Sequence, residues 1–229
     1  MNHSLPTTLA FSRLYSVSAD PAVTRGVERC SRDYRIDLHV AASLDSFVEI
    51  YTPDRPSCLV LDVELPGDRE VDLLETLKAS RAPVGVIGVG AEGRVPIIVR
   101  ALKAGALHFV EKPFEARDLL ESLPQALEEA TRRYLNARQW QDFEGRLRDL
   151  TDREREILWH VVLGKANKLI AWDLRISERT VEVHRFRLLR KMRVSSAVEL
   201  ARLVGAFECN GGATQSLSAT RILSSSSAA

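Results

Sequence analysis

Short apolar runs alternate with stretches of helical periodicity from about residue 9 to residue 113. Five of the runs are β-branched or mixed apolar segments bounded by polar, Gly or Pro residues, which is typical of buried strands. They are Leu14–Val17, Ile36–Val40, Cys58–Val63, Val84–Val89 and Leu107–Val110. Because strands that alternate with helices usually pair in parallel, the pattern predicts an α/β domain with a doubly wound, five-stranded parallel sheet.

Between the strands, apolar residues recur at a spacing of three to four, which indicates helices. The predicted helices are Pro21–Ser31, Leu44–Tyr51, Val71–Ala79 and Val95–Ala104. Asp20 and Ser43 are suitable N-caps, and Gly105 ends the fourth helix. In such a sheet the functional residues lie at the carboxyl ends of the strands, beside the switch in strand order.

A long helical stretch follows, from Glu115 to about Leu147, and Pro124 is expected to end or kink it. Its apolar stripe has a mean spacing near 3.5, as in coiled coils. The stripe consists of Leu123, Leu127, Ala130, Tyr134, Ala137, Trp140, Phe143 and Leu147. Two interpretations stay open, a seam between two copies of the chain and packing within one chain.

The last part of the chain reads as four further helices. They are Asp152–Leu163, Lys168–Leu174, Glu178–Met192 and Ser196–Ala206. Thr151 and Glu154 suit a capping box, and Ser177 suits an N-cap. The predicted division is an α/β domain over 9–125, a helical linker over 126–148, an all-α domain over 149–208 and a Ser/Gly/Ala-rich disordered tail over 209–229.

The formal charge is unevenly spread along the chain. Residues 151–207 hold 12 Lys and Arg against 7 Asp and Glu, whereas residues 1–150 hold 19 against 23. A basic small domain favours phosphate backbones as partners. No apolar run of about 18 residues and no secretory signal are found, so we expect a cytoplasmic protein without a membrane span. The three cysteines have unrelated spacings, which favours two core thiols and one tail thiol over a metal site or disulfide.

The helix Glu178–Met192 would be about 22 Å long, enough to lie across a major groove. One stripe, expected to pack on the small core, holds Val181, His184, Leu188 and Met192. The outward stripe mixes cations with two apolar side chains and consists of Glu182, Val183, Phe186, Arg187 and Arg190. Apolar groups there suit thymine methyls and base edges. Phosphate contacts are predicted for Lys168, Arg179, Arg187, Arg190 and Lys191.

The segment from Leu150 to Met192 closely resembles the LuxR-type helix-turn-helix of the NarL and FixJ response regulators. The matching residues are the LTxREREIL opening from Leu150, Gly164, Asn167-Lys168, Ile170-Ala171, Ile176-Ser177, RTVEVHR at Arg179–Arg185, and Arg190-Lys191-Met192. The resemblance implies a transcription regulator that binds double-stranded DNA, with Glu182, Val183 and Phe186 as base readers. Ser177 and Thr180 complete the predicted contact set. The resemblance further implies a homodimer, with the helix Ser196–Ala206 as a contact, and RNA polymerase as a partner.

The first domain resembles the receiver domain of the same regulators. Asp62 ends the third strand in CLVLDVELPG, Lys103–Gly105 precede the fifth strand, and Lys112 and Pro113 follow in VEKPF. The resemblance implies that Asp62 is the phosphoacceptor, that Lys112 is its partner, and that a sensor histidine kinase or another protein acts on this domain.

The receiver pattern is incomplete. Receivers hold Mg²⁺ with two adjacent carboxylates after the first strand, but here those positions are Ser18 and Ala19, with Asp20 beside them. The hydroxyl expected after the fourth strand is replaced by Gly90. We favour the interpretation that phosphorylation is weak or absent, that no cofactor is bound, and that Asp62 and Lys112 form a structural ion pair. The alternative is that Asp20 and Asp62 bind Mg²⁺, helped by Glu64.

Two other function classes are considered. An enzyme is not favoured, since the chain has no GxSxG, HExxH or Walker phosphate loop. Gly88, Gly90 and Gly93 do spell GxGxxG, with Glu111 at the end of the next strand, so nucleotide binding is a minor alternative. An adaptor that binds only protein is disfavoured because Glu182 is the one acidic residue on the outward stripe.

Overall fold

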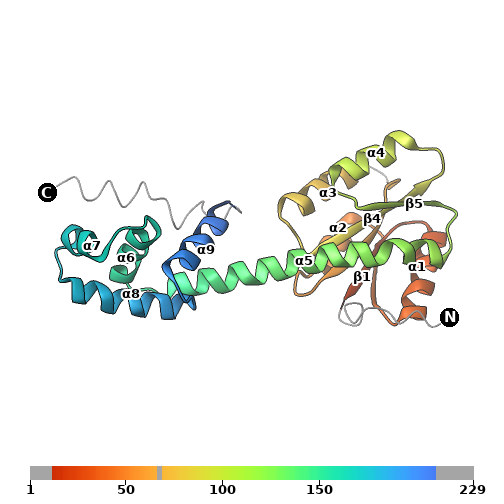
Figure 1. Ribbon diagram of the computed structural model, residues 1–229. Helices are drawn as coiled ribbons and strands as arrows, with labels where there is room; N and C mark the ends of the chain where they lie inside the picture. The colour runs from red at the N-terminus through yellow and green to blue at the C-terminus, as the bar shows by residue number, and fades with distance from the viewer. Residues whose placement is uncertain (1–11, 66–68, 210–229) are drawn as a thin grey trace. The chain divides into compact units, whose positions relative to one another are not determined.

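The computed structural model describes residues 12–65 and 69–209 (Figure 1). The chain forms two compact units, residues 1–137 and residues 138–229. Helix α5 (Ala116–Arg148) runs through the boundary between them. The predicted disordered tail lies, from residue 210, outside the described residues. Among the helices that the structure describes, none combines the length and the apolar character needed to cross a bilayer.

The first unit contains the predicted five-stranded parallel sheet. Its strands are β1 (Arg13–Val17), β2 (Asp37–Ala41), β3 (Ser57–Asp62), β4 (Val84–Ala91) and β5 (His108–Lys112). All neighbours are parallel and the order is β2-β1-β3-β4-β5. The chain therefore winds in one direction from β1 to β2 and in the other from β3 to β5, which puts the switch point between β1 and β3.

Helices cover both faces of the sheet. The core on one face holds side chains of α1 (Pro21–Tyr34) and α5. The core on the other face holds side chains of α2 (Leu44–Ile50), α3 (Glu70–Ala79) and α4 (Val95–Ala104). The predicted caps of α1 and α2 are confirmed, since Asp20 accepts from the Ala22 N–H and Ser43 forms a capping box with Ser46.

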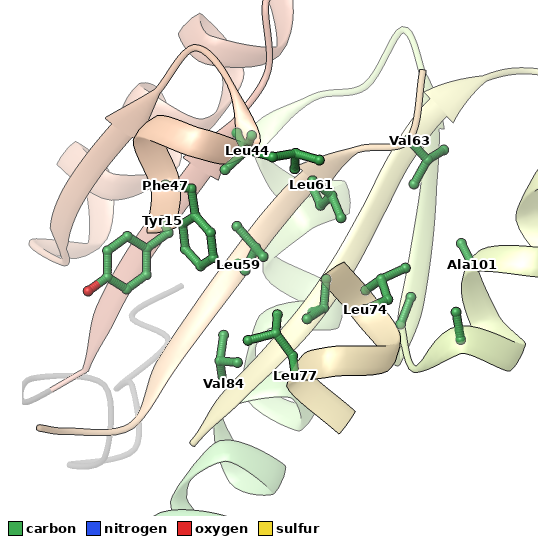
Figure 2. Close-up of a cluster of buried hydrophobic side chains, with 14 of the residues drawn as sticks. Tyr15, Leu44, Phe47, Leu59, Leu61, Val63, Leu74, Leu77, Val84 and Ala101 are labelled. Carbon is green, nitrogen blue, oxygen red and sulfur yellow. The ribbon is translucent and has the colours of Figure 1, made fainter. Parts of the chain in front are cut away.

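Alternate residues of each strand supply the two cores, as the pleat requires. Leu14 packs with α1 and α5, whereas the next residue, Tyr15, packs with α2. Figure 2 shows Leu59 and Leu61 of β3 in the second of these cores. Each such fully buried leucine contributes about 1.5–3 kcal/mol relative to an exposed one. Cys30 and Cys58 are buried free thiols, as predicted.

Of the two outcomes expected at Pro124, an end or a kink of the helix, the structure contradicts the end. Helix α5 is 33 residues long, with Pro124 inside it. Pro124 itself is exposed, while its neighbours Leu123, Ala126 and Leu127 are buried against the sheet. The apolar burial of these neighbours outweighs the hydrogen bond that a proline cannot donate.

The apolar stripe of α5 packs within the chain at both ends. Leu123 and Leu127 belong to the core of the first unit, and Phe143 and Leu147 belong to the core of the second. Of the two open interpretations, packing within one chain therefore accounts for these parts of the stripe.

The second unit is the predicted helical bundle. Its helices after α5 are α6 (Asp152–Val162), α7 (Asn167–Leu174), α8 (Glu178–Met192) and α9 (Ala197–Cys209). Their largest fully buried side chains are Ile157, Leu158, Ile170 and Leu188. The predicted capping box of Thr151 with Glu154 and the Ser177 cap are both present, so the local signals for the helix starts were read correctly.

Candidate nucleic-acid interface and carboxylate site

The carboxyl ends of β1 and β3 are joined by a hydrogen bond at the switch point. The Ser18 hydroxyl, one residue after β1, donates to Oδ2 of Asp62 at 2.7 Å. Asp62 is the last residue of β3, and its side chain is only 5% exposed. Its Oδ1 accepts from the backbone N–H of Glu64 at 3.1 Å. The topology thus brings the predicted aspartate to the edge where parallel sheets carry functional groups.

Lys112, the last residue of β5, lies among three carboxylates. Its Nζ is 2.8 Å from Asp62, 3.5 Å from Glu64 and 3.7 Å from Asp20. Burial lowers the pKa of Lys112. The hydrogen bond and charge of Asp62, together with the charges of Glu64 and Asp20, raise this pKa by more, so that it lies above its ordinary value. Lys112 is therefore a charged partner shared by the whole cluster.

The side chains around Asp62 do not fit a magnesium ion. Across residues 12–65 and 69–209, no three or more His, Cys, Asp or Glu side chains are placed to hold a metal. Asp20 uses one carboxylate oxygen to cap α1, and the other faces the Lys112 ammonium. The Ser18 hydroxyl donates a hydrogen bond to Asp62, and the Ala19 side chain has no atom that could bind a metal ion. The Lys112 ammonium already pairs with these carboxylates, so a divalent cation would have to compete with it for their oxygens.

Glu64 reaches from the end of β3 across to the end of β4. Its Oε2 accepts from the backbone N–H of Ala91 at 3.0 Å, and its Oε1 lies 3.7 Å from Nε of Arg94. Its side chain is 24% exposed. From the sequence, Glu64 is expected only to help hold Mg²⁺, and its partners Ala91 and Arg94 are not predicted. The signal was weak, because a backbone N–H at the end of a neighbouring strand leaves no mark in the sequence.

The glycines of the GxGxxG pattern do not form a phosphate loop, so the nucleotide-binding alternative is wrong. Gly88 and Gly90 lie inside β4, where a dinucleotide loop would need a turn between a strand and a helix. A Cβ at Gly88 would stand 2.9 Å from the Phe109 ring, and one at Gly90 would stand 3.0 Å from it. These glycines leave room for the side chain of Phe109 and not for a ligand.

The second unit presents a helix-turn-helix made of α7 and α8. Arg175, in the left-handed region at φ 53°, ends α7, and Ser177 accepts from the Thr180 N–H to begin α8. Val181, Leu188 and Met192 are buried in the bundle core. His184, which was assigned to the same stripe, is only half-buried, because the stripe drifts around the helix between Val181 and Leu188.

The opposite face of α8 is exposed. Val183 is 44% exposed and Phe186 is 67% exposed, and at a spacing of three residues the two side chains are neighbours on the helix surface. The exposed residues of this face are Arg179, Glu182, Val183, Phe186, Arg187 and Arg190. We call this set the α8 outer face; it brings together cations and apolar groups, as a surface for base edges and phosphates requires.

Lys191 has a different environment from the one predicted for it. Its ammonium lies 2.7 Å from Oε2 of Glu154 and donates to the Asp149 carbonyl at 3.0 Å. Glu154 is itself buried. The charge of Lys191 is therefore paired inside the unit, and its predicted phosphate contact stays a prediction.

The remaining predicted residues lie near the start of α8. The hydroxyls of Ser177 and Thr180 are 2.8 Å apart, and Ser177 is exposed. Lys168 is exposed on α7 beside Trp172. Trp172 is 82% exposed, and no role was predicted for it from the sequence. An open groove of about 630 Å³ is lined by Lys168, Ala171, Trp172, Arg175, Ile176 and Glu178. The position of Trp172, outside the buried face of α7 that contains Ile170, was the sequence signal that could have indicated this groove.

Comparison with known families divides the chain in the same way. Residues 15–124 match the family described as "Response regulator receiver domain". Residues 148–204 match the family described as "Bacterial regulatory proteins, luxR family". The domain bounds at single-residue level stay a prediction.

Relatives match this chain across most of its length. "Response regulator protein TodT" of Pseudomonas putida is 33% identical over 192 residues, which cover 84% of this chain and 85% of TodT. "Transcriptional regulatory protein FixJ" of Rhizobium meliloti is 37% identical over 170 residues, covering 74% of this chain and 82% of FixJ. The solved structure of "Response Regulator StyR" superposes with a TM-score of 0.72 at 33% identity, over 86% of this chain and all of StyR.

Proposed function

We propose that in this chain, which belongs to the response regulators with a LuxR-type DNA-binding domain, the α8 outer face reads DNA. We further propose that Asp62 is not phosphorylated in a Mg²⁺-dependent reaction. The chain is a DNA-binding transcription regulator by this membership. The observation that supports the assignment of α8 is the joint exposure of Val183 and Phe186 among arginines.

Within the α8 outer face, the side chains divide by chemistry. Glu182, Val183 and Phe186 reach base edges, where a carboxylate accepts from cytosine N4 and apolar groups meet thymine methyls. Arg179, Arg187 and Arg190 hold phosphates and fix the register. Lys168 and the hydroxyls of Ser177 and Thr180 add contacts to the backbone of the duplex.

The partners follow from the same assignment. The chain acts as a homodimer, with α9 as one contact, where Val198 is 80% exposed. A sensor histidine kinase or another protein meets the first unit, and RNA polymerase meets the DNA-bound form. The expected location is the cytoplasm, and the chain catalyses no reaction of its own.

The DNA assignment is tested by capture of fragmented genomic DNA on the full chain, followed by sequencing and anisotropy titration of a captured fragment. Arg190→Ala should weaken binding to every fragment and lower the slope of log K against log salt by about 1. Phe186→Ala should instead change which fragments are captured. Arg148→Ala removes a cation of α5 whose side chain is 76% exposed, and it serves as the control. Undiminished binding by a Phe186→Ala, Arg190→Ala double variant would exclude this face as the reader.

The assignment of Asp62 is tested by incubation with acetyl phosphate and Mg²⁺, followed by intact-mass measurement. We expect the mass to stay unchanged, because Asp62 is closed by Ser18, Lys112 and the Glu64 N–H, and the surrounding side chains do not fit the metal. A stoichiometric gain of one phosphoryl group that disappears in Asp62→Ala would show the opposite.

A further inference from the structure

We infer that Glu64 is a built-in anionic ligand: its carboxylate fills a pocket for a small oxyanion beside Asp62 and keeps free oxyanions out. This inference rests on the proposed function and gives a physical cause for it. The pocket is defined by three donors, which are the Ala91 N–H, the Lys112 ammonium and the Arg94 guanidinium.

The three donors come from different parts of the fold and converge on one carboxylate. Ala91 ends β4, Lys112 ends β5, and Arg94 stands just before α4. The distances to Glu64 are 3.0 Å from the Ala91 nitrogen, 3.5 Å from Lys112 Nζ and 3.7 Å from Arg94 Nε. A backbone N–H flanked by two cations is a set of donors suited to carboxylate or phosphate oxygens.

Glu64 is held over Asp62 from both sides. Its backbone N–H donates to Asp62 Oδ1, and Lys112 bridges the two carboxylates at 2.8 Å and 3.5 Å. Its Cγ lies 3.7 Å from the position that a Cβ at Gly90 would take. The stem of Glu64 therefore passes within ordinary van der Waals distance of position 90.

Charge explains why the pocket excludes other anions while Glu64 fills it. Asp20, Asp62 and Glu64 supply three negative charges against the two positive charges of Lys112 and Arg94. An incoming oxyanion would meet a surplus of negative charge and would have to displace a tethered carboxylate. Without the Glu64 carboxylate the charges balance, and the donors lose their acceptor.

The experiment uses inorganic phosphate as the probe and the full chain as the protein. Phosphate is titrated at constant ionic strength, set with chloride, and binding is followed by calorimetry and by the amide NMR signal of Ala91. The variants are Glu64→Ala, Glu64→Gln, and Glu64→Ala combined with Lys112→Ala. Glu92→Ala is the matched control, since it removes an exposed carboxylate from the turn that follows Ala91.

Glu64→Ala should bind phosphate at least about tenfold more tightly than the wild type and Glu92→Ala. The added Lys112→Ala change should abolish this gain. Glu64→Gln keeps the shape and loses the charge, so an intermediate affinity is expected. Sulfate should bind in the same order, which would show that the pocket takes oxyanions as a class.

Two results would overturn the inference. One is saturable phosphate binding by the wild type with the affinity of Glu64→Ala. The other is no gain in Glu64→Ala, with thermal melting and the NMR spectrum showing a folded first unit. Either result is distinct from failure of the proposed function, which would appear as phosphorylation of the wild type by acetyl phosphate.

Discussion

Val183 and Phe186 lie on the exposed face of α8, outside the bundle core. Val181, Leu188 and Met192 of the same helix belong to that core. Under the proposed function, contact with a duplex groove explains their place among arginines. The same helix would then have one face for folding and another for recognition.

A second residue-scale feature links the ends of two helices in the same unit. Glu154, in the first turn of α6, accepts from Lys191 Nζ at 2.7 Å and from the Thr151 N–H at 2.9 Å. Burial raises the pKa of Glu154. The hydrogen bonds from Lys191 and Thr151 together lower this pKa by more, so that it lies below its ordinary value of 4.5.

Glu154→Gln should destabilise the second unit at neutral pH by about 1 to 2 kcal/mol, since it removes a charged acceptor from a buried position. A carboxyl with a lowered folded pKa contributes stability above its unfolded pKa, and this contribution disappears as the pH falls through the folded value. The difference between wild type and variant should therefore shrink below about pH 4.5. Urea unfolding followed by Trp fluorescence measures it, because all three tryptophans lie in the second unit.

The control is Asp152→Asn, which changes a fully exposed carboxylate of the same helix turn. Its effect should be smaller and nearly independent of pH. An equal loss of stability in Asp152→Asn and Glu154→Gln would mean that the first-turn charge matters and the pair with Lys191 does not.

At the element scale, α5 packs on β4 without any side chain between them at one position. A Cβ at Gly85 would lie 2.1 Å from the carbonyl oxygen of Ala126, a backbone atom that cannot rotate away. This close approach lets α5 run past Pro124, because Ala126 and its neighbours are held directly against the sheet. Packing thus overrides the local signal of the proline.

Gly85→Ala should therefore lower the stability of the first unit by about 1–3 kcal/mol or more, as overpacking does in close-packed cores. Gly145→Ala, at a helix position with nothing within 4 Å, should raise stability by about 0.5–1 kcal/mol. Far-UV circular dichroism during thermal unfolding measures both, and Trp fluorescence should detect only the second change. A neutral Gly85→Ala variant would contradict the close packing of β4 and α5.

At the scale of the whole molecule, the two units carry opposite excess charge and separate chemistry. Residues 151–207 have five more cations than carboxylates, whereas residues 1–150 have four more carboxylates than cations. The acidic unit holds Asp62 in closed hydrogen bonds, and the basic unit exposes α8. Under the proposed function, DNA binding does not depend on phosphorylation of the first unit.

Acetyl phosphate with Mg²⁺ should accordingly leave the DNA affinity of the full chain unchanged within about twofold, measured by anisotropy at fixed salt. Asp62→Ala should bind the same fragment equally well. A tightening of about tenfold on treatment of the wild type, absent from Asp62→Ala, would show that the first unit controls binding through phosphorylation.

The succession of strands and helices along the chain, the helix caps and the two families of domain could all be predicted from the sequence. These follow from local rules, because periodicity, capping residues and contiguous motifs act between neighbours in the chain. The outward face of α8 could be derived in the same way, from the 3.6-residue turn alone.

The surroundings of those local features are visible only in the folded chain. Lys191 pairs with Glu154, and the Phe109 ring packs against Gly88 and Gly90. Helix α5 continues past Pro124, and Glu64 contacts Ala91 and Arg94. Each of these contacts joins residues from separate elements, and some use backbone atoms. Their energies depend on distances that the sheet and the bundle fix, which is why no local pattern in the sequence could reveal them.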